Sequence, residues 1–394
     1  MVPNKETFCI APFAHMNVTS KGYARVCCVS NEQPTHRYNE AQTWFSNNTM
    51  QSLRHNLIRG VKDPICSTCW KDEKVGKESL RKFYNKYVGN ILEQVWNKNF
   101  EKNKKLQDLI KNIDFKKVES FDFSLGNLCN LKCIMCSPKK SSKILVEAKL
   151  NPELEKYYDD ELNYDYTWPE KIEFKKWCDQ HLTSATYMNF TGGEPFMNPY
   201  LLNTLDTIDD TQKSKCILNL STNLTKINKK VISILKKFKN VYINVSVEGI
   251  GATLEYARYG HKWNDLETNL MKILEVDNTV VSISHVIQAP TIKGIKKLVE
   301  YFDNCKIDIS PIFLTEPNCY QIQSIKTKYK EGILDSFENY NGHNKKYVSA
   351  VTNFIKHNMD YNVNLAKQCV YRLKSFDKVR KNKFQDVIPV DYFI

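Results

Sequence analysis

Three cysteines lie close together in the segment "SLGNLCNLKCIMCSP", which spans residues 124–138. Cys129, Cys133 and Cys136 are separated by three and then by two residues. Three thiolates at this spacing can bind three irons of a cubane cluster and leave the fourth iron open to a ligand. A structural zinc site is the alternative. It needs a fourth ligand, and no further Cys or His occurs between residues 124 and 150.

A second group of cysteines stands near the N-terminus: Cys9, Cys27, Cys28, Cys66 and Cys69. Gly22 precedes Cys27 with four residues between them, and Cys66 and Cys69 form a CxxC pair. The chain has 13 cysteines, an odd number, and several are clustered. In a reducing compartment such clusters indicate metal ligands rather than disulfides. A zinc site is again the alternative, because four thiolates that include a CxxC pair also suit zinc.

Glycine and polar residues follow three other short apolar runs. "TYMNFTGGEPFMNP" ends its run with Gly192 and Gly193, which permit close backbone approach, and then continues with Glu194 and Pro195. The Glu194 carboxylate is suited to accept hydrogen bonds from an ammonium group. The next two runs end in a second polar set: Ser221, Thr222, Asn223, Ser246, Glu248 and, further on, Arg258. Ordinary turn and N-cap chemistry is the alternative for these six residues.

These residues follow elements that alternate in type along the chain. Between residue 118 and about residue 325, six short apolar runs are separated mostly by amphipathic stretches: "SFDFSL", "TYMNFT", "CILNLST", "VYINVSV", "VSISHVI" and "IDISPIF". Such alternation predicts an α/β fold with a parallel sheet wrapped by helices. Six units favour an open partial (β/α)6 barrel. The candidate residues then follow the carboxyl ends of strands, where barrels build their active sites.

The pattern predicts four parts: residues 1–78, rich in cysteine; a basic helical connector at 79–117; the barrel at 118–325; and a mostly helical extension at 326–394. The first connection of the barrel is long. Its acidic and aromatic residues 151–168 are expected to form a surface insertion.

The "CNLKCIMC" segment resembles the CxxxCxxC signature of the radical S-adenosylmethionine (SAM) enzymes. This resemblance implies a [4Fe–4S] cluster on Cys129, Cys133 and Cys136, whose open iron binds SAM and cleaves it to a 5′-deoxyadenosyl radical. Met135 stands where the family usually has an aromatic residue near the adenine. Residues 192–195 match the family's GGEP motif, which implies that Glu194 binds the methionyl amine of SAM. The six polar residues after the later runs resemble family segments that contact the cofactor.

The N-terminal cysteines resemble the half-motif of the SPASM/twitch modules, in which a Gly lies four residues before a Cys. That resemblance implies an auxiliary [4Fe–4S] cluster on Cys9, Cys27, Cys66 and Cys69, with Cys28 as the rival of Cys27. In the related enzymes such modules usually follow the barrel, whereas here the module precedes it. Cys319, in the loop after the sixth run, is a candidate to return a hydrogen atom to a substrate radical.

The two resemblances imply radical chemistry on a peptide or protein side chain, with reduced flavodoxin or ferredoxin as the electron donor. The same chemistry on a nucleotide, sugar, tRNA or other small molecule is the alternative. A non-catalytic metal-binding or nucleic-acid-binding protein is an alternative of another class. The intact triad followed by GGEP argues against that last class.

The net charge of +13 is uneven along the chain. Residues 71–117 carry 13 Lys/Arg against 7 Asp/Glu, and residues 367–383 carry 7 against 1. Only 8 of the 57 basic residues are Arg, the residue favoured for phosphate and base contacts. A solvated Lys-rich surface is therefore favoured over a nucleic-acid partner, and an acidic peptide remains an option. The chain has no membrane-length apolar run, and its start lacks the layout of a signal peptide, so we expect a cytoplasmic protein and no membrane partner.

Overall fold

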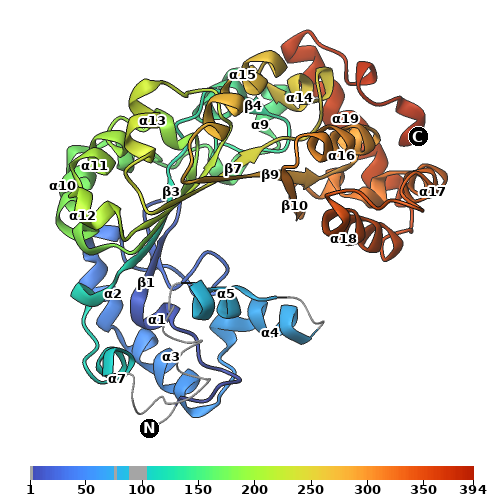
Figure 1. The fold of residues 1–394 in the computed structure, drawn as a ribbon. Helices are drawn as coiled ribbons and strands as arrows, with labels where there is room; N and C mark the ends of the chain where they lie inside the picture. Colours follow the sequence, from blue (N-terminus) through green and yellow to red (C-terminus); the bar gives the residue numbers. More distant parts are fainter. Residues whose placement is uncertain (1–2, 75–77, 88–103) are drawn as a thin grey trace. The chain divides into compact units, whose positions relative to one another are not determined.

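The computed structural model describes residues 3–74, 78–87 and 104–394. Its main feature is a mostly parallel sheet of eight strands in the order β10-β9-β7-β6-β5-β3-β1-β2 (Figure 1). The strands are β1 (His15–Val18), β2 (Ala24–Arg25), β3 (Ser120–Leu125), β5 (Tyr187–Gly192), β6 (Ile217–Thr222), β7 (Asn240–Ser246), β9 (Thr279–Ile287) and β10 (Asp308–Phe313). All six apolar runs form strands here, which confirms the α/β class and is consistent with a partial barrel.

Two of the eight strands come from the N-terminal residues and were not expected from the sequence. β1 pairs in parallel with β3, with His15 opposite Ser120 and Val18 opposite Phe123. β2 then pairs with β1 in the antiparallel direction. These strands have four and two residues, too few to show a clear alternation of apolar and polar side chains.

The chain divides into two compact units. Unit 1 contains Met1–Gly126, Asp165–Asn219 and Lys237–Val241, and unit 2 contains Asn127–Tyr164, Leu220–Lys236 and Tyr242–Ile394. Of the predicted basic connector, α5 and α7 are described, whereas its residues 88–103 lie outside the described part of the chain.

Unit 1 packs aromatic residues on one face of its strands. Its helices are α1 (Ala11–Ala14), α2 (Ala41–Ser46), α3 (Asn48–Arg59), α4 (Ser67–Lys74), α5 (Leu80–Tyr87), α7 (Lys104–Lys111), α10 (Ile172–His181), α11 (Leu201–Thr207) and α12 (Asp210–Lys213). Phe123 of β3 stacks on Phe190 of β5 with ring centroids 5.5 Å apart. Trp177 of α10 meets the rings of Phe121 and Phe123 edge-on. This layer holds α10 against β3.

The opposite face of the same strands is polar, because side chains alternate along a strand. Asn17 of β1 is in register with Asp122 of β3, and Asp122 with Asn189 of β5. The Asn189 Nδ2 donates a hydrogen bond of 2.8 Å to Asp122 Oδ1. A parallel sheet that is covered by apolar layers on both faces has nearly continuous apolar strands. The row of polar residues therefore marks the face that is available to a polar ligand.

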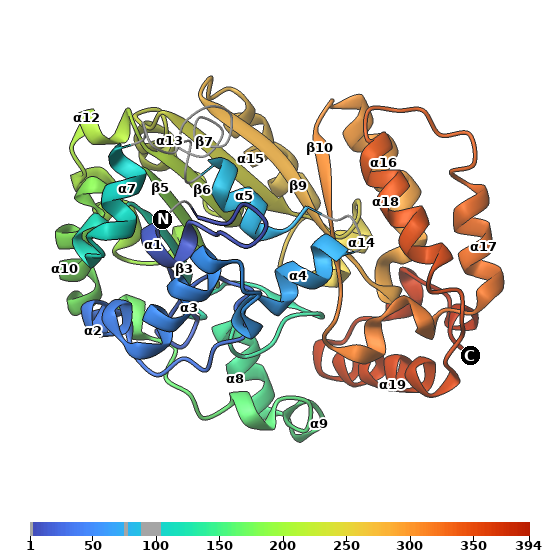
Figure 2. The same cartoon turned by 90° about the horizontal axis from the view of Figure 1, so that it is seen from below.

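Unit 2 contains the remaining helices and a small antiparallel ladder of β4 (Lys132–Cys133) and β8 (Arg258–Tyr259). The helices are α8 (Ser142–Leu150), α9 (Pro152–Glu155), α13 (Lys229–Leu235), α14 (Ala252–Ala257), α15 (Trp263–Leu274), α16 (Ile295–Asn304), α17 (Thr327–Asp335), α18 (Lys345–Lys356) and α19 (Val363–Arg380). Figure 2 shows α16 and α18 beside β10, with α17 next to α18. Within the described ranges, no helix combines the length and apolar character needed to cross a membrane.

The segment 151–168 differs from the expected surface insertion. Tyr158 and Leu162 are buried in unit 2, and Tyr166 and Trp168 are buried in unit 1. Glu153, Glu155, Asp160, Glu161 and Asp165 stay at least partly exposed, and the described side chains that point inward are aromatic or aliphatic.

Gly192 at the end of β5 has a backbone that only glycine adopts easily. Its φ is +117°, and an added Cβ would lie 2.4 Å from the backbone nitrogen of Leu125. We expect Gly192→Ala to lower the free energy of unfolding by roughly 1–3 kcal/mol. Gly332→Ala is the matched control, because Gly332 is helical and has open space around it. That control should raise the free energy of unfolding by about 0.5–1 kcal/mol. Urea denaturation measures both, and equal effects would contradict the role of the Gly192 backbone.

Candidate functional site

The three cysteines of the sequence triad are brought together in unit 2. Cys129 and Cys133 are buried with Leu131, and Met135 and Cys136 pack against them. Cys133 belongs to β4, where it pairs with Arg258 of β8. This ladder fixes the middle cysteine, and the backbone N–H of Cys136 donates to the carbonyl of Cys133.

The three thiols influence one another's protonation. A hydrogen bond between Cys133 and Cys136, together with burial, raises the pKa of Cys133, while the same bond lowers the pKa of Cys136. The charge of Cys129 opposes ionisation of Cys136. Two buried thiols and a partly buried third, packed together, cannot all ionise without a compensating positive charge, and bound iron provides such a charge. The donor set therefore fits an iron–sulfur cluster.

Two N–H donors point at the sulfur atoms of the triad. Arg258 Nη1 lies 3.8 Å from Cys133 Sγ, and Asn223 Nδ2 lies 3.8 Å from Cys129 Sγ. Arg258 also forms a buried ion pair with Glu248, in which Nη2 donates to Oε1 at 2.8 Å. Burial alone would lower the pKa of Arg258, but the charges of Glu248 and Cys133 raise it above its ordinary value. Arg258 therefore stays cationic beside the thiols.

The sequence predicted cofactor contacts for Asn223, Glu248 and Arg258. In the structure, Glu248 binds Arg258, while the side-chain amide of Asn223 binds Asn130 of the cysteine loop and the backbone N–H of Thr225 in its own loop. Asn223 Nδ2 donates to Asn130 Oδ1 at 3.0 Å. The buried ring of His261 lies with Nε2 2.7 Å from the Asn223 carbonyl oxygen.

The other polar residues of this set lie at the ends of their strands. Ser221 and Ser246 are half-buried at the carboxyl ends of β6 and β7. Thr222 Oγ1 accepts a hydrogen bond from the backbone N–H of Leu224, which has a left-handed φ of 59°. His261 was missed from the sequence because it lies 38 residues from Asn223 and has no motif around it.

The GGEP residues 192–195 belong to unit 1. Gly193 is half-buried, and Pro195 begins the short helix η8 (Pro195–Met197). Glu194 is 2% exposed, and its Oε1 accepts a hydrogen bond from the backbone N–H of Phe196. One carboxylate oxygen therefore caps η8 and fixes the side chain.

The N-terminal cysteines form a second cluster of thiols in unit 1. The charges of Cys9, Cys27 and Cys69 all act on Cys66, and those of Cys27 and Cys69 act on Cys9. Burial is the main cause that raises the pKa of all four, for Cys27 to about 12. Ionising these buried thiols therefore also requires a bound cation.

Cys28 faces a different environment from Cys27. Cys28 is exposed at the surface, whereas Cys27 is buried. Partial desolvation, and then the charge of Asp122 on the polar row of the sheet, raise the pKa of Cys28. Cys28 also acts on the phenols of Tyr84 and Tyr187.

Gly22 of the predicted half-motif stands in the turn between β1 and β2. Its φ is +82°, and an added Cβ would lie 3.1 Å from the indole of Trp168. Both features require glycine at this position.

Within the described ranges, no three His, Cys, Asp or Glu side chains are arranged to hold a single metal ion. In a cubane cluster each thiolate binds a different iron, so its sulfur ligands lie farther apart than those of one zinc ion.

Cys319 is in the short helix η10 (Asn318–Tyr320) and is 8% exposed. Its pKa is raised by burial and lowered by the charge of Arg372. Its own charge acts on Cys369 of α19. The structure thus places this thiol against α19, and its catalytic role stays a prediction.

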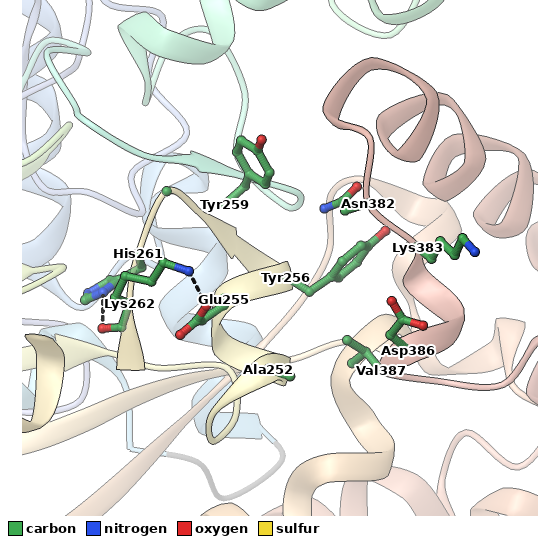
Figure 3. A pocket seen from close by; sticks show the side chains of 11 residues that line it. Ala252, Glu255, Tyr256, Tyr259, His261, Lys262, Asn382, Lys383, Asp386 and Val387 are labelled. Carbon is green, nitrogen blue, oxygen red and sulfur yellow. Dashed lines mark hydrogen bonds and ion pairs between the residues drawn. The ribbon is translucent and has the colours of Figure 1, made fainter. Parts of the chain in front are cut away.

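A pocket of about 460 Å³ lies beside β8 in unit 2 (Figure 3). An ion pair of Lys262 with Glu255, 2.8 Å long, stands on one side, and Asn382 and Asp386 stand on the other. His261 also lines the pocket, so the residue that holds the Asn223 carbonyl borders this space.

Solved structures with some similarity to the chain include SuiB, anSMEcpe and the radical S-adenosylmethionine methyltransferase TsrM. SuiB from Streptococcus suis bound to precursor peptide SuiA is 17% identical, with a TM-score of 0.39, and the match covers 71% of this chain and 60% of SuiB. anSMEcpe with bound AdoMet and Kp18Cys peptide is 16% identical, with a TM-score of 0.37, and 60% and 61% are covered. TsrM from Kitasatospora setae, with cobalamin and [4Fe-4S] cluster bound, is 14% identical, with a TM-score of 0.28 and coverages of 36% and 29%. The chain thus spans about 60% of the length of SuiB.

No curated protein matches the chain. Residues 123–308 match the Radical SAM superfamily. This range begins within β3, contains the triad and the GGEP residues, and ends at the first residue of β10. The segment from β3 to the start of β10, called the family domain below, therefore matches the Radical SAM superfamily over a little under half of the chain, and members of that superfamily use SAM and a [4Fe–4S] cluster for radical chemistry.

Proposed function

We propose that this protein is a radical SAM enzyme whose catalytic cluster is held by Cys129, Cys133 and Cys136. The observation that carries the proposal is the burial of three thiols side by side in the loop after β3, within the family domain. When bound, the cluster supplies an electron that splits SAM into methionine and a 5′-deoxyadenosyl radical, which takes a hydrogen atom from the substrate. A purely structural metal site is not favoured, because a structural zinc site is closed by four protein ligands.

The chain's own residues bind and orient the reacting groups. Arg258 and Asn223 direct N–H groups at two of the sulfurs, and such hydrogen bonds tune the potential of a cluster. Glu194, held by its cap on η8, binds the amine of SAM through its carboxylate. The half-buried Ser221 and Ser246 at the strand ends are available to the ribose or the carboxylate of SAM.

Replacing all three cysteines of the triad by Ala tests this proposal. The variant should form no 5′-deoxyadenosine and should keep about four irons per chain, against about eight in the reconstituted wild type. Chromatography of the nucleoside product and iron analysis measure the two quantities. Cys305→Ala, at an exposed cysteine outside both groups, is the control and should behave as wild type. Undiminished SAM cleavage by the triple variant would contradict the assignment.

We further propose that Cys9, Cys27, Cys66 and Cys69 bind an auxiliary [4Fe–4S] cluster with no open iron. The support is their mutual electrostatic interaction and the position of Gly22, whose turn precedes Cys27. Four thiolates satisfy four irons, so neither SAM nor substrate can ligate this cluster. A cluster that joins distant segments also stabilises a region with a small apolar core.

Separate substitutions of Cys27 and Cys28 distinguish the proposed ligand set from the one in which Cys28 replaces Cys27. Cys27→Ala should lower the iron content from about eight to about four, whereas Cys28→Ala should leave it near eight. The reason is that Cys27 interacts with Cys66 and Cys9, while Cys28 faces Asp122. Iron, sulfide and zinc analysis of both variants provides the measurement. Zinc in the wild-type N-terminal region, or iron loss in the Cys28 variant alone, would refute the ligand set.

The proposed substrate is a peptide or protein side chain. Its support is the resemblance of the N-terminal cysteines to modules that accompany peptide modification, together with a basic surface on α19 and the residues after it. Five lysines of residues 367–383 are exposed: Lys367, Lys374, Lys378, Lys381 and Lys383. The two arginines of this segment, Arg372 and Arg380, are buried. The negative charge of an acidic peptide is complementary to the positive charge of the exposed lysines, whereas a neutral sugar gains nothing from that charge.

An acidic peptide incubated with reduced enzyme and SAM should change in mass and raise 5′-deoxyadenosine above background. Reversing the charge of Lys374 and Lys381 should weaken peptide binding, because their attraction to the acidic groups becomes repulsion. Lys296→Glu, at an exposed lysine of α16, should leave peptide binding unchanged. Mass spectrometry and a binding titration at low salt check both results. Fast turnover of a free sugar or nucleotide with no peptide binding would overturn the substrate class.

A further inference from the structure

The last long helix, α19, lies beyond the family domain, and its two arginines point into unit 2. Arg372 and Arg380 are 5% and 6% exposed, in a helix whose lysines are exposed. We propose that α19 positions the cysteine loop through two chains of contacts, Arg372–Tyr158–Cys136 and Arg380–Glu147–Lys132. The inference rests on the proposed function, since it assigns a role toward the cluster of that same site.

The first chain ends on the backbone of the third cysteine. Arg372 Nη2 donates to Tyr158 Oη at 2.9 Å, and Tyr158 Oη lies 3.3 Å from the Cys136 carbonyl oxygen. A guanidinium can only donate, so the phenol accepts from Arg372 and its own proton is directed at that carbonyl.

Arg372 is held in place by aromatic rings. Its guanidinium carbon lies 4.5 Å from the ring centroid of Tyr157 and 5.1 Å from that of Tyr158, and Tyr320 and Phe376 lie at 5.7 Å. Among the described residues, no carboxylate forms an ion pair with Arg372. A buried cation without a carboxylate is costly, so the ring contacts and the bond to Tyr158 are what hold the guanidinium in this position.

The second chain ends beside the middle cysteine. Arg380 Nη2 donates to Glu147 Oε2 at 2.7 Å, and Glu147 Oε1 lies 2.6 Å from Lys132 Nζ. Lys132 precedes Cys133 in β4 and pairs with Tyr259 of β8. Tyr259 Oη in turn donates to the carbonyl oxygen of Arg380 at 3.4 Å. α19 thus contacts β8 directly and is linked to β4 through Glu147 of α8.

The first chain of contacts, through Tyr158, matters most for the position of Cys136. This cysteine lies outside β4, and its backbone N–H makes only a turn hydrogen bond to Cys133. Tyr158 therefore supplies a contact that fixes the carbonyl of Cys136 and with it the direction of its side chain. A cluster ligand that is free to turn away exposes its iron to solvent and to chelators.

Tyr158→Phe is the direct test, because it keeps the ring against Arg372 and removes only the hydroxyl. We expect iron of the triad cluster to pass to a chelator about tenfold faster than in wild type, at the low end of the loss for outer-shell partners. We also expect the electron paramagnetic resonance spectrum of the reduced triad cluster to shift. Tyr157→Phe is the matched control, since its hydroxyl contacts Ser375 at 3.3 Å and it packs on the same arginine. That control should match wild type in both measurements.

Arg372→Lys provides a second variant that keeps the charge but loses the planar fork. It should shift the same spectrum, whereas a role in stability alone would lower Tm and leave the spectrum unchanged. An unchanged spectrum and iron release in Tyr158→Phe would overturn the inference. The signal is first identified as the one that is absent from the triple Ala variant of the triad. If no signal depends on the triad, the proposed function fails; if one does and Tyr158→Phe leaves it unchanged, only the role of α19 fails.

Discussion

Burying several acidic thiols side by side is the constraint on which unit 2 depends. Each thiol that loses its proton raises the cost of ionising the next, as the opposite pKa shifts of Cys133 and Cys136 show. The structure answers with fixed donors and cations around the loop: Asn223, Arg258, Arg372 and Arg380. Arg258 and Arg380 are themselves neutralised by Glu248 and Glu147. Two of the three arginines around the site are thus paired with carboxylates, whereas Arg372 is held by aromatic rings and by Tyr158.

Unit 1 also contains polar side chains on its strands, and it keeps them apart from its apolar core. One face of β3 and β5 is an aromatic layer against α10, and the other is a polar row that includes Asp122 and Asn189. The aromatic layer supplies the burial that holds the strands, so the polar side chains are not needed for packing. The charge of Asp122 in this row acts on the exposed Cys28, while the buried Cys27 acts on Cys9 and Cys66.

Much of the fold could be predicted from the sequence because the six strands of residues 118–325 are apolar runs bounded by turns. β1 and β2 could not be predicted, since strands of four and two residues are too short to show an alternation of apolar and polar side chains. The cysteine triad was visible because its ligands are close in sequence. The roles of Tyr158 and Arg372 were not visible, because 214 residues separate them and each looks like part of a surface segment. Arg380 was counted as surface charge for the same reason: composition does not tell which side of a helix a residue occupies.

The inward arginines of α19 bear on where this protein can be divided. The family domain ends at residue 308, yet Glu147 inside it is paired with Arg380 outside it as well as with Lys132 inside it. A fragment cut at the family boundary would keep the buried carboxylate with Lys132 and lose Arg380, the more deeply buried of its two cations. It would also lose the guanidinium that orients the phenol of Tyr158. A fragment that keeps the contacts around the three cysteines must therefore extend through α19. A domain that is transferred to another protein must include this helix for the same reason.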